Sequence, residues 1–280
     1  MPDKVYIIGA GPGAADLLTL RAANLLRAAH VVLHDDLVPR EILDLCPCSA
    51  EIVNVGKRCG RQGSSQERIN ALMIWHATEP APERTIVRLK SGDPSVFGRL
   101  GEEIDALRRA GVPYEIVPGV TAAAAAAAAA GLTLTDRRSA SALVLVTAHN
   151  TRNESLERTM FAPERSTYAI YMPGPDYGRT ARELIDSGLD AATPCAVVSN
   201  AGRANEEARF FTLADLAVAT GIPAPALLIV GEVAREHRRH EEAPTEISTL
   251  TLSLPKGKGR DRYRPAEVQV QAEESLSGQP

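Results

Sequence analysis

The loop Ser91-Gly92-Asp93-Pro94 combines residue types that suit contact with a small ligand. It follows the segment Thr85–Leu89, which predicts a strand. Gly92 lets another molecule approach the backbone closely, and Pro94 biases Asp93 away from helical geometry. Because open α/β sheets bind ligands at the carboxyl ends of their strands, this loop is a candidate binding site. Taken alone, the same four residues also fit an ordinary turn.

A glycine-rich loop follows the first apolar run, Lys4–Ile8, and offers a second candidate site. Gly9, Gly11 and Ala14 fit the G-x-G-x-x-G/A pattern of dinucleotide-binding proteins, and an aspartate lies about 20 residues later. A Pro-Gly pair makes this loop stiff and wide, and the next helix begins too late for its N-terminus to hold a pyrophosphate. A dinucleotide-dependent oxidoreductase therefore stays open as an alternative that these residues do not favour.

Strands and helices alternate along the first half of the chain, which predicts a parallel sheet. Thr19 fits the N-cap of a first helix, and a second helix is expected from about Ser65 to His76. An amphipathic helix is expected after the Ser91 loop. The predicted strands are Lys4–Ile8, Val31–Leu33, Glu51–Val55, Thr85–Leu89 and Tyr114–Val117.

Nine consecutive alanines, Ala122–Ala130, follow a Pro-Gly hinge after the last of these strands. Alanine favours helix but buries little side chain, so we expect this helix to let its neighbours pack closely. Further helices are expected near residues 179–187 and 212–219, and short loops between strands favour a mixed sheet. The strands predicted there are Leu143–Thr147, Thr167–Met172, Cys195–Ser199 and Ala226–Val230.

Composition argues against several classes of protein. The 280 residues carry a net charge of -4, whereas proteins that bind nucleic acid usually present a basic surface. No apolar run approaches the roughly 18 residues that span a bilayer, and no signal peptide is found, so we expect a cytoplasmic protein without a membrane partner. The four cysteines lack the spacing of a zinc site, and Cys46 and Cys48 are expected to be thiols rather than a redox pair.

Several longer stretches resemble the tetrapyrrole methylase family, and within it the uroporphyrinogen-III C-methyltransferases. Residues 88–103, RLKSGDPSVFGRLGEE, are similar to the family pattern RLKGGDPxVFGRGGEE. Residues 117–137, VPGVTAAAAAAAAAGLTLTDR, are similar to VPGVTSAxAAAAxAGIPLTHR. The opening GAGPGAADLLTL resembles GxGPGDxxLLT, and residues 56–70 fit GKRxGxxxxxQxxIN. The segments at 171–174 and 225–233 match later parts of the family pattern.

This resemblance implies transfer of methyl groups from S-adenosylmethionine to C2 and C7 of uroporphyrinogen III, giving precorrin-2, with no metal required. It implies a two-domain α/β fold with a parallel N-terminal sheet, a mixed C-terminal sheet and a cleft between them. The domains are expected at residues 1–117 and 118–240, followed by a disordered tail at 241–280. A homodimer is expected, and another precorrin C-methyltransferase of the family is the nearest alternative.

The resemblance also implies a role for particular residues. Asp35 matches the proposed proton acceptor, and Lys57 matches the proposed proton donor. Glu102 lies three residues after Arg99 and on the same helical face, so it either shares in proton transfer or forms an ion pair with Arg99. The residues expected to hold S-adenosylmethionine are Pro12, Ser91, Gly92, Asp93, Val96, Thr121, Ala122, Met172 and Ala201.

Arginines in the matching segments are expected to bind the carboxylates of the substrate, because a guanidinium pairs with a carboxylate through two hydrogen bonds. These are Arg58, Arg99 and Arg137. Two expected positions depart from the family pattern. Ser91 stands where the family has glycine, and Asn200-Ala201-Gly202 replaces the family's Asn-Gly-Thr.

Overall fold

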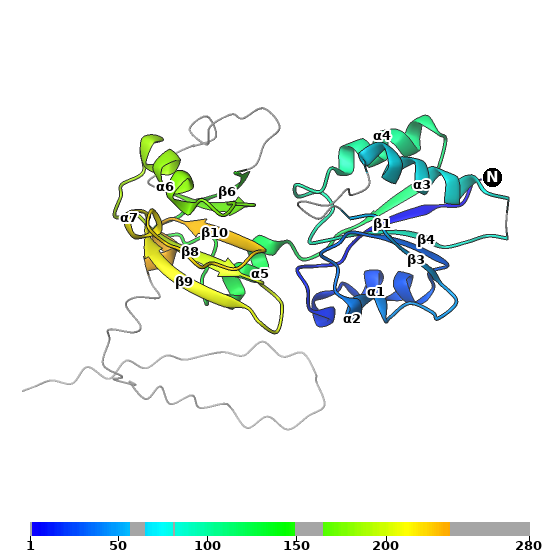
Figure 1. Ribbon diagram of the computed structural model, residues 1–280, viewed down its shortest axis with the longest axis horizontal. Helices are drawn as coiled ribbons and strands as arrows, with labels where there is room; N and C mark the ends of the chain where they lie inside the picture. The colour runs from blue at the N-terminus through cyan, green and yellow to red at the C-terminus, as the bar shows by residue number, and fades with distance from the viewer. Residues whose placement is uncertain (1, 57–64, 81, 149–164, 236–280) are drawn as a thin grey trace, which may run out of the picture. The chain divides into compact units, whose positions relative to one another are not determined.

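The computed structural model describes residues 2–56, 65–80, 82–148 and 165–235. These residues form two five-stranded sheets, each covered by helices (Figure 1). By its contacts the chain divides into residues 1–241 and 242–280, so both sheets belong to the first unit. The domain boundary near residue 117 stays a prediction, and the predicted tail lies outside the described residues. Within those ranges no helix is both long enough and apolar enough to cross a membrane.

The first sheet is entirely parallel, with the strand order β3-β2-β4-β1-β5, as predicted. Each strand begins and ends within one residue of its predicted bounds. Because all five strands run in one direction, the loops that follow them meet at one edge of the sheet. The strands are β1 (Val5–Gly9), β2 (Val31–His34), β3 (Glu51–Asn54), β4 (Ile86–Lys90) and β5 (Tyr114–Val117).

Helices cover both faces of the first sheet (Figure 1). On one face lie α3 (Gln66–Thr78) and α4 (Leu100–Arg109), and on the other lie α1 (Leu20–Arg27) and α2 (Arg40–Leu43). The apolar cluster on the α3 and α4 face includes Ile7, Leu33, Ile69, Met73 and Leu107. The cluster on the α1 and α2 face includes Ile8, Leu26, Val32 and Ile42. Alternate residues of each strand therefore feed two separate cores.

Two of these helices, α1 and α3, begin at capping residues that their sequences indicate. The Thr19 hydroxyl accepts a hydrogen bond from the Ala22 N–H at 3.1 Å, which confirms Thr19 as the N-cap of α1. Ser65 caps α3 in the same way, accepting from the Arg68 N–H at 3.2 Å. α4 and α2 begin without a side-chain cap, and α2 is a single short turn that the sequence did not predict.

The second sheet is mixed, as predicted, with the strand order β6-β7-β10-β8-β9. β6 and β7 pair in parallel, and the other neighbours pair antiparallel. Each predicted strand is present within one residue of its expected bounds. The strands are β6 (Ala142–Thr147), β7 (Ser166–Tyr171), β8 (Pro194–Ser199), β9 (Glu207–Thr212) and β10 (Ala226–Val230).

The helix predicted at residues 212–219 is wrong in part. The chain forms the unpredicted strand β9 up to Thr212 and then only the short helix α7 (Leu213–Leu216). Thr212 ends the strand and also caps the helix, since its hydroxyl accepts from the Asp215 N–H at 3.1 Å. β9 is an edge strand with polar and half-exposed residues, so it lacks the apolar run that marks its neighbours.

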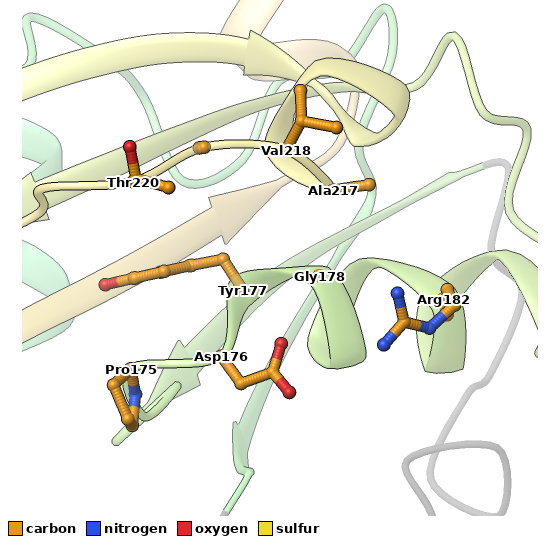
Figure 2. A pocket seen from close by; sticks show the side chains of 9 residues that line it. Pro175, Asp176, Tyr177, Gly178, Arg182, Ala217, Val218 and Thr220 are labelled. Carbon is orange, nitrogen blue, oxygen red and sulfur yellow. The ribbon is translucent and has the colours of Figure 1, made fainter.

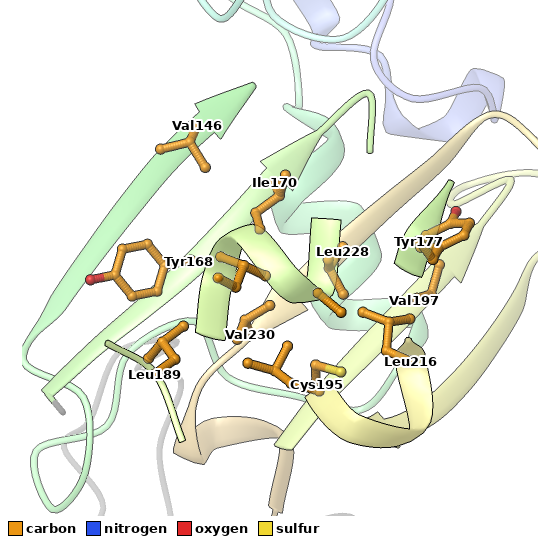
Figure 3. Close-up of a cluster of buried hydrophobic side chains, with 13 residues drawn as sticks. Val146, Tyr168, Ile170, Tyr177, Leu189, Cys195, Val197, Leu216, Leu228 and Val230 are labelled. Atoms are coloured by element: carbon orange, nitrogen blue, oxygen red, sulfur yellow. The ribbon is translucent and has the colours of Figure 1, made fainter. Parts of the chain in front are cut away.

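Helices also cover both faces of the second sheet. On one face, α6 (Tyr177–Asp186) packs against the end of α7, where a Cβ on Gly178 would lie 2.8 Å from the Ala217 carbonyl oxygen (Figure 2). Beneath these helices lies the cluster of Tyr168, Ile170, Leu228 and Val230 with its neighbours (Figure 3).

The alanine helix α5 (Ala122–Ala129) packs against the opposite face of this sheet. Ala123 and Ala126 are fully buried beside Leu227 and Ile229. Close packing was the expectation for most of these alanines, and it is confirmed.

Leu228 lies on the central strand of the second sheet and is fully buried, so its truncation tests this core. We expect Leu228→Ala to lower the free energy of unfolding by about 2–5 kcal/mol, because it leaves a cavity among packed side chains. The matched control is Leu20→Ala, since Leu20 is 85% exposed, and its effect should stay within about 0.5 kcal/mol. Urea unfolding of both variants gives the comparison, and equal effects would contradict this core assignment.

Candidate active site

Three glycines meet where β1, β4 and β5 end. A Cβ placed on Gly9 would lie 2.6 Å from both the Gly119 Cα and the Gly92 carbonyl oxygen. A Cβ on Gly119 would lie 2.4 Å from that same oxygen. These distances are shorter than any real Cβ contact, so larger residues at Gly9 or Gly119 would force the loops apart. The glycines therefore let three loops share one small space.

The β1 loop and the β4 loop are also joined by backbone hydrogen bonds. The Gly11 N–H donates to the Gly92 carbonyl at 3.1 Å, and the Gly92 N–H donates to the Gly11 carbonyl at 2.8 Å. A 3₁₀ turn, η1 (Ala15–Leu17), then separates this loop from α1. A pyrophosphate would need free N–H groups at a helix N-terminus. The geometry therefore argues against the dinucleotide site that the glycine pattern left open.

Asp93 ties the β4 loop to the hinge after β5. One oxygen of its carboxylate accepts the Gly119 N–H at 3.0 Å. The other accepts the Ser95 N–H at 2.8 Å and the Ser95 hydroxyl. Partial burial raises the pKa of Asp93, but the hydrogen bonds from Ser95 and Gly119 outweigh it and lower the pKa below its usual value. The carboxylate is thus held ionised and helps to shape the loop.

The outer side of Gly92 faces open space. Its φ is +68°, and a Cβ built there would meet no atom within 4 Å. Ser91 and Val96 on the same loop are half-buried. Because no side chain covers the backbone at Gly92, a flat ligand could pack directly against it and form hydrogen bonds with its polar groups.

The β1 loop also meets the loop after β8, which carries Ala201. A Cβ on Gly202 would lie 2.7 Å from the Cγ of Pro12. The Arg203 guanidinium donates to the Leu37 carbonyl at 2.7 Å, two residues beyond Asp35. The segment that departs from the family pattern therefore still reaches the predicted site.

Backbone strain gathers in the predicted site loops. In the described part of the chain, the non-glycine residues with positive φ are Phe97, Arg99, Met172 and Asn200. Two of them lie in the β4 loop, one follows β7, and one precedes Ala201. Such residues cost of order 1–3 kcal/mol each and cluster at functional sites. Their positions support the ligand-binding segments expected from the sequence.

Tyr171 is a residue of this region that the sequence reasoning missed. Its hydroxyl lies 2.5 Å from the hydroxyl of Thr121, the N-cap residue of α5, and accepts the Ala123 N–H at 3.1 Å, so it satisfies a first-turn N–H that the Thr121 side chain does not. Its ring packs against Phe97, with centroids 5.0 Å apart. Thr121 and the half-buried Ala122 are thereby fixed beside the β4 loop and Met172. The sequence signal that could have identified Tyr171 is its place directly before Met172, in the segment 171–174 that matches the family pattern.

Asp35 directly follows β2 at the edge where the loops meet. One oxygen of its carboxylate lies 2.5 Å from the Arg88 guanidinium, and the other accepts the Ser91 N–H at 3.2 Å. Arg88 also pairs with Glu103, which in turn pairs with Lys90. Sequence reasoning missed these three buried residues. Two charged residues alternating with apolar ones inside a buried strand were the signal that could have found them.

The other predicted site residues lie on the surface or outside the described ranges. Arg99 and Glu102 form a two-point ion pair, with both nitrogen–oxygen distances 2.7 Å, and the Glu102 carboxylate raises the pKa of Arg99. The ion pair that sequence reasoning offered for them is therefore present. Arg137 is exposed in the turn from Asp136 to Ala140. Lys57 and Arg58 lie outside the described residues.

A separate hollow opens on the second sheet, between the start of α6 and the residues after α7 (Figure 2). Its walls include Tyr177, Arg182 and Val218. None of the residues predicted for the site lines it. Among the described residues, no three His, Cys, Asp or Glu side chains are grouped as a metal ion would require.

Comparison with known proteins agrees with this arrangement. The family model for tetrapyrrole (corrin/porphyrin) methylases matches residues 4–217. A uroporphyrinogen-III C-methyltransferase from Paracoccus denitrificans is 44% identical over 236 residues, covering 82% of this chain and 81% of that protein. Siroheme synthase 1 from Cronobacter sakazakii is 43% identical over 238 residues, covering 84% of this chain but 50% of that protein. The chain thus spans about half the length of such siroheme synthases.

A solved structure is also similar. Uroporphyrin-III C-methyl transferase from Thermus thermophilus, complexed with S-adenosyl homocysteine, matches with a TM-score of 0.71 and 37% identity. The match covers 83% of this chain and 94% of that one. With its two sheets, its glycine-lined loops and these matches, the chain belongs to the family of tetrapyrrole (corrin/porphyrin) methylases.

Proposed function

We propose that this protein transfers methyl groups from S-adenosylmethionine to C2 and C7 of uroporphyrinogen III, giving precorrin-2. The observation that carries this proposal is the meeting of the Gly9, Gly92 and Gly119 loops beside Asp35, at the edge of the parallel sheet. Its support from relatives is the Paracoccus denitrificans enzyme named for this substrate. The Thermus thermophilus structure with S-adenosyl homocysteine supports the methyl donor.

The residues around the glycines fit S-adenosylmethionine. Open space in front of Gly92 leaves room for adenosine against bare backbone, while Asp93 holds the loop in place. The side chains and backbone proposed to hold the donor are those of Pro12, Ser91, Gly92, Asp93, Val96, Thr121, Ala122, Met172 and Ala201. Ala201 is proposed to contribute through its backbone, since its segment departs from the family pattern.

S-adenosylmethionine supplies an electrophilic methyl group on its sulfonium, so the chain needs no covalent nucleophile. When a pyrrole carbon takes the methyl group, the ring becomes positive and must then lose a proton. Asp35 is proposed to accept that proton. Lys57 is proposed to return a proton to the ring as its double bonds rearrange, and a second proton then leaves to solvent, so that one proton is lost for each methyl group added. Glu102 is proposed to take part through its ion pair with Arg99, which holds its carboxylate in a fixed place.

Arginines are proposed to orient the substrate through its carboxylates. The Arg99 side chain is 47% exposed although it is paired with Glu102, so its guanidinium remains accessible to a second anion. Arg137 and Arg58 are the other proposed partners. Holding the reacting carbon close to the methyl group supplies much of the acceleration by itself, because it removes the cost of bringing two molecules together.

The direct test is anaerobic incubation of the protein with uroporphyrinogen III and S-adenosylmethionine, followed by mass spectrometry. We expect a product heavier than the substrate by two methyl groups. If the protein binds S-adenosylmethionine but the substrate gains no methyl group, another precorrin becomes the substrate to test. Thermal stabilisation by NAD(P) and not by S-adenosylmethionine would instead favour the oxidoreductase alternative.

Asp35→Asn tests the proton acceptor. We expect the turnover number to fall by about 100-fold or more, because the variant keeps the shape of the side chain but cannot take up a proton. Asp105→Asn is the matched control, since Asp105 is exposed on α4, and it should retain normal turnover. Steady-state kinetics of both variants checks this, and normal turnover of Asp35→Asn would refute the assignment.

Gly119→Ala tests the glycine junction. The added methyl would overlap the Gly92 carbonyl, so the β4 loop must move, at a cost of about 1–3 kcal/mol. We expect the dissociation constant for S-adenosyl homocysteine, measured by calorimetry, to rise about tenfold or more. Gly101→Ala is the control, since a Cβ on Gly101 meets no atom within 4 Å. Equal affinity of the two variants would show that the junction does not shape the site.

Assembly as a homodimer and a cytoplasmic location belong to the same proposal. The support for both is the resemblance to the family. Light scattering from the purified full chain measures the mass in solution, and a monomer at all concentrations would contradict the dimer.

A further inference from the structure

Two charged residues lie within the buried strand β4. Arg88 and Lys90 alternate with Val87 and Leu89 and therefore point to the sheet face that α3 and α4 cover. Their side chains are each only 3% exposed, and that of Glu103, which meets them from α4, is 0% exposed. The proposed reaction uses none of these three groups.

The contacts form a continuous chain from α4 to Asp35. One oxygen of Glu103 lies 2.9 Å from the Arg88 Nε and 3.0 Å from the Lys90 Nζ. At its other end, the Arg88 Nη2 lies 2.5 Å from an Asp35 oxygen. The remaining nitrogen, Nη1, donates to the Leu33 and Leu89 carbonyls at 3.3 and 3.1 Å. Every nitrogen of the guanidinium is therefore engaged, which leaves it a single orientation.

The negative and positive charges of this cluster are equal in number. Asp35 and Glu103 carry two negative charges, and Arg88 and Lys90 carry two positive ones. Burial and the neighbouring charge of Arg88 lower the pKa of Lys90. The Glu103 carboxylate contacts both cations and offsets their mutual repulsion. Stability alone does not explain such an arrangement, because a well-packed apolar set of similar volume is often as stable as a buried ion pair.

We infer that Arg88 and Glu103 are positioning residues that hold the Asp35 carboxylate in the orientation in which it faces the substrate. Glu103 fixes Arg88 from the interior, Arg88 fixes one oxygen of Asp35, and the Ser91 N–H fixes the other at 3.2 Å. This inference rests on the proposed function, in which Asp35 accepts the proton. Arg88 and Glu103 are shielded from solvent, and Arg88 carries their contact with Asp35.

The test is a cycle of variants measured with uroporphyrinogen III and S-adenosylmethionine. Arg88→Gln alone leaves Glu103 paired with Lys90 but removes the cation from the half-buried Asp35 carboxylate, and is expected to lower the melting temperature. The paired variant Arg88→Gln/Glu103→Gln removes one charge of each sign but leaves Lys90 without a carboxylate, so binding of S-adenosyl homocysteine serves as the check that the variant is folded. Its turnover number should remain about 100-fold low, because the carboxylate is no longer aimed. Its affinity for S-adenosyl homocysteine should stay within about threefold.

The same pair of substitutions in the Asp35→Asn background decides whether the cluster acts through Asp35. If Arg88 and Glu103 act by positioning Asp35, adding both substitutions to Asp35→Asn should lower the turnover number by less than about threefold relative to Asp35→Asn alone. The reason is that the effects of coupled residues are not additive. An equal loss of turnover in both backgrounds, or wild-type turnover of the paired variant, would overturn the inference.

Two controls separate the possible failures. Arg179→Gln/Glu183→Gln removes an exposed ion pair of α6, 2.8 Å long, and should leave turnover unchanged. Wild-type protein assayed in parallel tests the proposed function itself. No methyl transfer by the wild type would refute that function, whereas failure of the cycle with an active wild type would refute only the positioning role.

Discussion

The close approach of Gly9, Gly92 and Gly119 is the constraint on which the candidate site depends. Parallel strands bring their carboxyl ends to one edge, but ordinary side chains would keep the loops several ångströms apart. Because these three positions lack a Cβ, the backbone of one loop touches the next. The hydrogen bonds between Gly11 and Gly92, and from Gly119 to Asp93, then hold the loops together. On its outer side, the Gly92 backbone borders open space, because no side chain lies within 4 Å of a Cβ built there.

Rigid supports on both sheets surround this junction. In the first sheet, the buried charges of Arg88, Lys90 and Glu103 lie directly behind Asp35. In the second, the Tyr171 hydroxyl caps the alanine helix. Alanine has no side chain to cap or brace its own helix, so a residue from β7 does so. Left-handed residues such as Phe97 and Met172 persist because these supports leave the loops no alternative.

Sequence patterns predicted most of the fold, because most of its strands are short runs rich in β-branched and other apolar residues. The failures have physical causes. β9 is an edge strand whose half-exposed, polar residues show no such run, and only pairing with β8 makes it a strand. Arg88 alternates with apolar residues, a pattern that by itself also fits a strand with one exposed face, and its burial depends on Glu103, fifteen residues away on another element.

The sequence by itself determined every strand except β9, the parallel and mixed character of the two sheets, and the segments proposed to carry the site. It did so because local periodicity, capping residues such as Thr19 and the long family motifs are all properties of neighbouring residues. Only the tertiary structure decided which groups act together. Asp35 meets Arg88, and Asp93 meets Gly119, across strands distant in the chain, and such contacts exist only once the sheet has brought the loops to one edge.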